Sequence, residues 1–339
     1  MLHIFSTAAN AVLPIILLIL LGNLLRNKGL LTEGFVKAGS KFVFRIGLTC
    51  SLFVNVYNIT DLSSISWGFI VYVIGITLVM FFLGYVSAVA TTKIRERRGV
   101  ILQCTFRSNF AIIGLSLASA LGGAEAEAVA SLVSAFILPV YNIMGVIALS
   151  LFVEAPNSGK HSMKNVLISI CKNPMVLGAT AGLLCILLRE LQNLLFNRTV
   201  FSISRDLPFL FKAINNIKAM TTPLALIVLG AQFKFSAVRG MFKEIAVGTV
   251  WRIVIAPLVG VGCALVACHF GLLTCGTGEI ATLISLFGAP AAVSTAVMAA
   301  EMGSDEQLAT QQVVWTSIGS MLTIFLQVCI LMATGILNI

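Results

Sequence analysis

Long apolar runs alternate with short polar segments along the whole chain. A run of about 20 apolar residues is long enough to cross a bilayer as a helix. Runs of roughly this length lie at 4–25, 39–58, 67–90, 100–121, 128–150, 170–189, 219–233, 245–268, 279–300 and 311–336. The pattern therefore predicts an all-α polytopic membrane protein with about ten transmembrane helices.

Two of these runs are interrupted near their centres, and the later one lies at 280–300. It contains Ala289 and Pro290, followed by Ser294 and Thr295. Proline has no backbone donor and disrupts the helical turn before it, which leaves backbone groups unpaired at the middle of the membrane. Such groups are not tolerated against lipid, so the run is expected to face protein or a watery cavity. The alternative is a kink packed harmlessly in protein.

The earlier interrupted run carries Arg107, Ser108 and Asn109 inside an apolar segment. A buried side-chain amide must be hydrogen-bonded, so Asn109 is expected to bind either freed backbone or a ligand. Arg107 either faces the bundle interior or snorkels to the inner membrane face. Asn142, in the next run, is expected to reach the same region or to join helices. The serines and threonine of both runs either line a pocket or bond their own helix.

Two interrupted helices in corresponding places of two half-chains indicate a transporter binding site. The predicted organisation is a first five-helix repeat at 1–150, a cytoplasmic connection at 151–169 and a second five-helix repeat at 170–339. Apolar and polar residues alternate with helical spacing at about 193–218, which predicts an amphipathic linker helix lying in the membrane interface.

Basic residues indicate how the chain is oriented. With the N-terminus outside, fourteen of the 22 Lys and Arg residues fall in inner loops and five lie around the linker. This bias predicts both termini outside a cell membrane, and five spans per half then make the repeats inverted. Three basic residues fall inside spans, and of these Arg45 and Arg252 are expected to snorkel or to pack between helices.

Composition agrees with a membrane protein and excludes several other classes. The chain is 58% hydrophobic and 10% charged, and its net charge of +9 comes from short loops rather than from a nucleic-acid-binding patch. All 13 carboxylates map to loops or span ends. Neither a metal site nor a cofactor motif is present, and the eight cysteines are expected to be single buried hydrophobes. Because no histidine or aspartate pair lies at mid-span, no catalytic residue is expected.

Several segments, taken in order, resemble the auxin efflux carrier family, which includes bacterial malate-permease-like proteins and the plant PIN carriers. They include VLPIILLILLGNLLRNKGLL, RSNFAIIGLSLA, LPVYN, NPMVLGATAGLL, LPFLFKAINNIKAMTTPLALIVLGAQF and GAPAAVSTAVMAAEMGSDEQLATQQVV. Two departures stand out. Ser116 occupies the place of a proline that the family often has in span four, and span two reads Gly47-Leu48-Thr49-Cys50 where a proline is common.

The resemblance implies ten spans in two inverted halves, with spans four and nine broken and crossing at the substrate site. It places Asn109 and Pro290 at the crossing, with Asn142 nearby, and implies transport of small organic anions. A sodium-coupled symporter of the bile-acid type is the main alternative, and a receptor-like binding protein is another. The expected partners are an organic anion and the lipid bilayer, and a homodimer is one arrangement left open.

Overall fold

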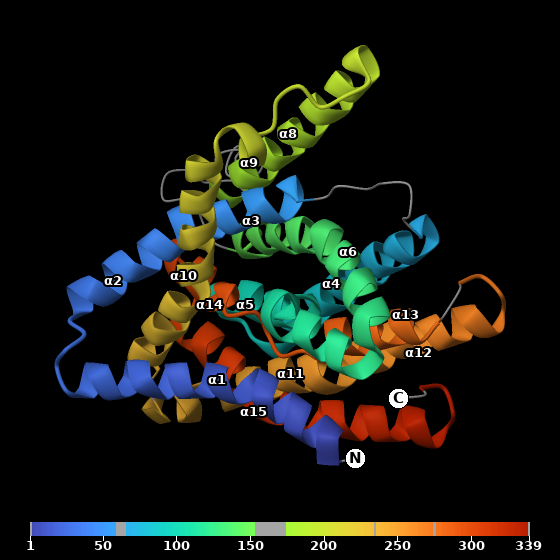
Figure 1. Ribbon diagram of the computed structural model, residues 1–339. Coiled ribbons are helices and arrows are strands. Elements are labelled where there is room, and N and C mark those ends of the chain that lie inside the picture. Colours follow the sequence, from blue (N-terminus) through green and yellow to red (C-terminus); the bar gives the residue numbers. More distant parts are fainter. Residues whose placement is uncertain (1, 59–65, 153–173, 234, 274–275, 338–339) are drawn as a thin grey trace.

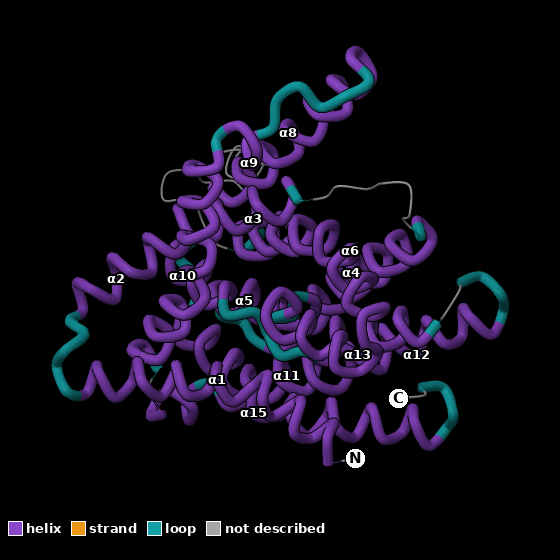
Figure 2. The backbone as a smooth tube through the Cα atoms, viewed as in Figure 1, coloured by secondary structure: helices purple, strands orange, loops and turns teal. Residues whose placement is uncertain are grey.

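The computed structural model describes residues 2–58, 66–152, 174–233, 235–273 and 276–337. These residues form helices and no β-strand (Figures 1 and 2). The first part of the chain contains α1 (Leu2–Asn27), α2 (Glu33–Phe42), η1 (Val43–Gly47), α3 (Leu48–Tyr57), α4 (Trp67–Thr91), α5 (Arg95–Phe106), η2 (Phe110–Gly114) and α6 (Leu115–Ser150). The second part contains α8 (Pro174–Phe196), α9 (Ile203–Asp206), α10 (Pro208–Gln232), η3 (Phe235–Gly240), α11 (Phe242–Val250), η4 (Trp251–Ile255), α12 (Ala256–His269), α13 (Thr277–Gly288), α14 (Ser294–Glu301) and α15 (Glu306–Ala333).

Six helical stretches are long and apolar enough to cross a membrane, among the residues described. They are Trp67–Thr91, Leu117–Ser150, Pro174–Phe196, Pro208–Gln232, Phe242–His269 and Glu306–Ala333. Their outer faces are apolar as well. On α8, the exposed side chains include Leu183, Leu184, Leu187, Leu188, Leu191, Leu194 and Leu195. Exposed leucines in such number suit hydrocarbon rather than water, so the fold is that of a multi-pass membrane protein.

Glycine separates two expected spans inside α6. The backbone leaves the helical conformation at Gly122 and Gly123, and the φ of Gly123 is 63°. A residue with a Cβ adopts this left-handed conformation only with strain. The bend falls between the runs expected at 100–121 and 128–150.

The centre of the molecule is a buried core built around α13. Every residue from Ile280 to Gly288 is buried, which means that this part of the helix has no face toward solvent or lipid. It packs against α6, α12 and α15, and Figure 1 shows these helices gathered beside it. A helix covered on all sides can end inside the bundle, because its terminal backbone groups meet protein rather than lipid.

The amphipathic segment differs from the expected layout. Residues 193–218 contain the end of α8, the short helix α9 and the beginning of α10. Helix α10 runs without interruption from Pro208 to Gln232 instead of starting near residue 219. The helix can begin at Pro208 because the first turn of a helix does not use the backbone N–H that proline lacks. The connection expected at 151–169 and the first residues of the span expected at 170–189 fall largely outside the described residues.

Not every cysteine is the single buried hydrophobe that the sequence predicts, since Cys263 is exposed. Cys104 is buried and donates to the Gly248 carbonyl oxygen, as a small core residue would. Cys268, near the end of α12, is instead disulfide-bonded. Sequence spacing did not reveal this bond because the chain contains no C-x-x-C pair.

Candidate functional site

Both expected interruptions are present, and they lie side by side. Helix α5 ends at Phe106 and the π-helical turn η2 begins at Phe110, while α13 ends at Gly288 and α14 begins at Ser294. In Figure 2 the unwound segments are the loop-coloured stretches near the centre of the molecule. The first break forms without proline, at a place where Ser108 and Asn109 offer side chains that compete with helical bonding.

The two unwound segments pair with each other. Ser108 and Ala291 form an isolated antiparallel bridge. The backbone N–H of Asn109 donates to the Pro290 carbonyl oxygen at 2.7 Å, and the backbone N–H of Ala292 donates to the Arg107 carbonyl oxygen at 3.4 Å. Each break therefore satisfies backbone groups that the other leaves free, which is what permits two helices to open inside an apolar bundle.

A side chain from α15 completes this pairing. The Ala291 amide donates to the Thr316 hydroxyl at 3.0 Å, and Thr316 is fully buried. The same hydroxyl donates to the Gln312 carbonyl oxygen at 2.6 Å, so it holds the second break to the body of α15.

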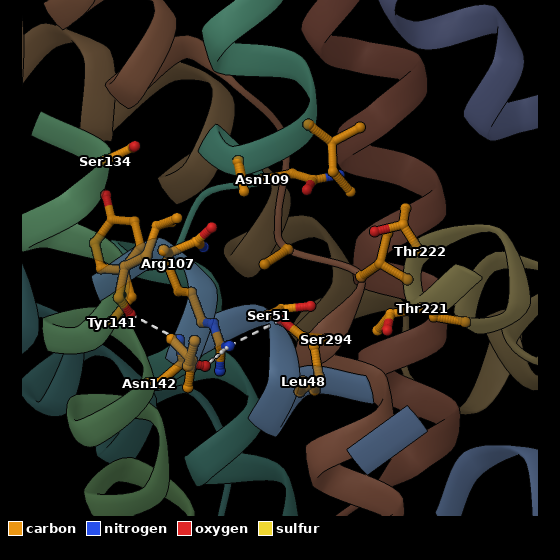
Figure 3. Close-up of a pocket in the computed structure, with 18 of the residues that line it drawn as sticks. Leu48, Ser51, Arg107, Asn109, Ser134, Tyr141, Asn142, Thr221, Thr222 and Ser294 are labelled. Atoms are coloured by element: carbon orange, nitrogen blue, oxygen red, sulfur yellow. Dashed lines mark hydrogen bonds between the residues drawn. The ribbon is translucent and has the colours of Figure 1, made fainter. Parts of the chain in front are cut away.

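A cavity of about 230 Å³ opens beside the paired breaks (Figure 3). One wall comes from the breaks and from α6, and the other from α3, α8 and α10, which pack against one another. Its lining comprises Leu48, Ser51, Leu52, Asn55, Arg107, Ser108, Asn109, Ala111, Ile112, Leu115, Ser134, Leu138, Tyr141, Asn142, Met175, Lys218, Thr221, Thr222, Ala225, Ala292, Val293 and Ser294. None of these lining residues is acidic, whereas two are basic.

Arg107 dominates the electrostatics of the cavity. Its side chain is buried, with 3% of the residue exposed. One terminal nitrogen donates to the Asn142 side-chain oxygen at 2.5 Å and to the Ser294 hydroxyl at 2.8 Å (Figure 3). The other terminal nitrogen contacts the Gln103 side-chain oxygen at 3.3 Å and the Met298 sulfur.

All of these partners are neutral, and no ion pair to Arg107 is found among the residues described. A buried guanidinium without a carboxylate is costly, because no negative charge replaces the water that it has lost. An anion bound in the cavity would supply that missing charge. Of the two alternatives left open for Arg107, the structure shows the one in which it lines a cavity.

Two amides assist at the same wall. Asn142 accepts from Arg107 and donates to the Leu138 carbonyl oxygen at 2.6 Å, so it orients the guanidinium. Asn109 is buried, and its amide nitrogen has no partner among the described residues. An unpaired buried donor costs about 1–3 kcal/mol, which a bound acceptor recovers.

The helix ends add to the positive potential. η2 and α14 both begin next to the cavity, where Asn109, Val293 and Ser294 line it. The first N–H groups of a helix have no internal partner and carry a partial positive charge. The breaks thus present N-terminal helix ends, a guanidinium and a free amide donor to the same space.

A family model described as a membrane transport protein matches residues 7–328. The chain belongs to this family of membrane transporters, that of the auxin efflux carriers. No curated protein matches the chain. Membership of a transporter family also supports the expectation that the protein is not an enzyme.

In this transporter, five of the eight residues expected at the site line the cavity: Arg107, Ser108, Asn109, Asn142 and Ser294. The other three do not. Ala289 is fully buried, and Pro290 contributes its carbonyl oxygen to the pairing of the breaks. Thr295 is buried one position beyond the lining, with no hydrogen-bond partner for its hydroxyl among the described residues.

Sequence reasoning missed the second basic residue of the transporter's cavity. Lys218 lies on α10, and its amino group donates to the Asn55 side-chain oxygen at 2.8 Å. The alternation at 193–218 predicts that Lys218, the last residue of that stretch, lies on an interfacial helix. The available signal was that Lys218, Thr221, Thr222 and Ala225 recur at helical spacing, which becomes visible once the helix is continued through residue 219.

Proposed function

We propose that the protein is a secondary carrier of small organic anions, with carboxylates such as malate-like or auxin-like acids as its expected substrates. The observation that carries the proposal is the buried Arg107, which lines the cavity and bonds only neutral groups. The absence of acidic residues from the lining and the presence of Lys218 point in the same direction. The family supports transport as the activity.

The proposed architecture is ten spans in two inverted five-helix halves. Besides the six long apolar helices, α1, α2–α3, α5–η2 and α13–α14 correspond to the remaining spans. The two breaks then correspond to each other, one in the fourth span and one in the ninth. The two halves rock about the paired breaks and expose the cavity to each side of the membrane in turn.

The proposed orientation has both termini outside the cell membrane. The excess of basic residues in the loops assigned to the inside supports it. The disulfide of Cys268 is a second, independent support. Disulfides persist in oxidising compartments, and in this orientation α12 ends on the outside.

In the proposed binding mode, the carboxylate of the substrate lies between Arg107 and Asn109. The guanidinium supplies the opposite charge, and the free Asn109 amide supplies a directional donor. The apolar lining residues, among them Leu48, Ile112 and Leu138, contact the body of the substrate. Lys218 lies on α10 in the opposite wall, where it meets a second polar group of the substrate.

The experiment replaces Asn109 with Ala and measures uptake of labelled malate and of an indole-type carboxylic acid into proteoliposomes. The variant is expected to insert and fold normally, because the pairing with Pro290 uses the backbone of Asn109 and the lost side-chain nitrogen has no partner to leave behind. Uptake is expected to fall by roughly tenfold or more, the value of one hydrogen bond to a charged group.

Asn215→Ala is the matched control, because Asn215 lies on α10 and its amide donates to the backbone of its own helix. It is expected to transport like the unaltered protein. Unchanged transport by Asn109→Ala would remove Asn109 from the site. A sealed-vesicle assay in which the ligand binds but does not cross would favour a receptor-like protein instead.

A further inference from the structure

A second buried arginine lies behind the paired breaks, outside the cavity. Arg252 belongs to the π-helical turn η4 and is 0% exposed, so it does not snorkel. One of its terminal nitrogens donates to the Phe287 carbonyl oxygen at 2.6 Å. Phe287 is next to the last residue of α13, immediately before the second break.

The charge of Arg252 is not balanced by a carboxylate among the described residues. Its remaining nitrogens, Nε and Nη1, have no hydrogen-bond partner there. Arg252 is also absent from the lining of the cavity, and so it does not contact a substrate held there. Its function must therefore follow from the end of α13, the group that it does contact.

The end of α13 is negatively polarised. The last four carbonyl groups of a helix lack internal partners and carry about half a negative elementary charge in total. In carriers built from interrupted helices, freed carbonyl groups and C-terminal helix ends are the groups that coordinate a coupling cation. Arg252 places a permanent cation at one of these ends.

We propose that Arg252 is a resident cation at the carbonyl end of the second broken helix, and that the protein therefore carries its anion without binding a sodium ion there. The inference rests on the proposed carrier function and specifies its coupling. It decides between the two kinds of carrier that the sequence left open. A guanidinium bonded to Phe287 occupies the position in which a sodium ion would find its carbonyl ligands.

The other break supports this assignment. Helix α4, one of the helices that pack against α5, contains no Lys or Arg. The arginine at the end of α5 is Arg107, which follows the helix directly and is bonded in the cavity. Each break thus has one buried arginine. Among the described residues, no group of His, Cys, Asp or Glu side chains is arranged to hold a metal ion.

The experiment measures the melting temperature of the purified carrier in detergent, in sodium chloride and in choline chloride at equal ionic strength. Three variants are compared with the unaltered protein. Arg252→Ala leaves a space where the guanidinium was, and Arg252→Met removes the charge and fills the space. Arg45→Ala removes an exposed arginine from another π-helical turn, η1.

The unaltered protein and Arg45→Ala are expected to melt at the same temperature in both salts. Arg252→Ala is expected to melt higher by at least about 2 °C when sodium or methylguanidinium is added, because a free cation then restores the lost interaction. Arg252→Met is expected to show no such rescue. The difference between the two variants shows whether the end of α13 needs a positive charge beside it or only a side chain that fills the space.

Two results would overturn the inference. One is a higher melting temperature of the unaltered protein in sodium than in choline, which shows a sodium site despite Arg252. The other is an Arg252→Ala variant that neither cation stabilises. If that variant does not fold, the comparison of salts on the unaltered protein still decides the matter. Because melting requires no transport, a failure of the proposed substrate class leaves a different signature.

Discussion

The two helix breaks pair with each other through their backbones, but they differ in their side chains. The first, at residues 107–109, has no proline and carries its own charge, which faces the cavity. The second, at 289–293, contains Pro290, is buried throughout, and receives its arginine from the neighbouring turn η4. Under the proposed function, the first break supplies the binding groups, whereas the second supplies backbone partners and a helix N-terminus.

The largest expected effect comes from the charge of the first break. Arg107→Met should abolish measurable anion uptake, because losing one partner of a buried charged pair costs about 2–5 kcal/mol, or roughly thirtyfold or more in affinity. Stability should hold or rise, since the arginine has no carboxylate partner among the described residues. Arg45→Met is the control, because Arg45 is exposed. Uptake that persists in Arg107→Met would break the proposed division of labour.

The support of the second break should show in stability rather than in selectivity. Thr316→Val removes the hydroxyl that accepts from the Ala291 amide and leaves that buried N–H unpaired. The free energy of unfolding is expected to fall by about 1–3 kcal/mol. Thr323→Val is the control on the same helix, because its hydroxyl bonds only its own backbone. Equal melting temperatures for the two variants would show that the break does not depend on Thr316.

The effect of the position of the Arg107 guanidinium can be tested separately from the effect of its charge. A Cβ added at Gly145 would lie 2.7 Å from a terminal nitrogen of Arg107, so Gly145→Ala should displace the guanidinium while the fold adjusts around a flexible side chain. Anion uptake is expected to fall by about tenfold, the cost of weakening one charged hydrogen bond. Gly262→Ala is matched to it, because no atom lies within 4 Å of the added Cβ. Equal uptake by both variants would mean that the position of Arg107 is not critical.

The smallest expected effect concerns the opposite wall. Lys218→Met should weaken uptake of dicarboxylates by a few-fold and leave monocarboxylates nearly unchanged, because a partly exposed lysine is screened and worth about 1 kcal/mol or less. Lys212→Met, at an exposed position of the same helix, should change neither. A larger loss than that of Arg107→Met would transfer the main anion-binding role from the first break to α10.

The interruptions themselves could be predicted from the sequence. Arg107 and Asn109 in one apolar run, and Pro290 in another, are residues that a lipid-facing helix does not tolerate, and such residues mark their own positions. Asn142 and Ser294 also proved to line the cavity with Arg107. Asn142 lies on α6 and Ser294 on α14, and the expectation that the two breaks meet brings these two elements together.

Other features depended on packing that no local pattern contains. Lys218 lines the cavity because α10 runs as one helix from Pro208 through residue 218 into the bundle. The hydropathy pattern of residues 193–218 fits an interfacial helix equally well. Arg252 is fully buried although arginine seldom is, because the unpaired end of α13 lies next to it. The Cys268 disulfide depends on how the end of α12 is placed, which spacing alone does not give.

The most direct test of the account compares the unaltered carrier with Arg107→Met in a thermal-shift screen of organic mono- and dicarboxylates. We predict that at least one carboxylate raises the melting temperature of the unaltered protein and of Arg45→Met, and that none raises that of Arg107→Met. Equal shifts in the presence and absence of Arg107, or stabilisation by organic cations alone, would contradict it.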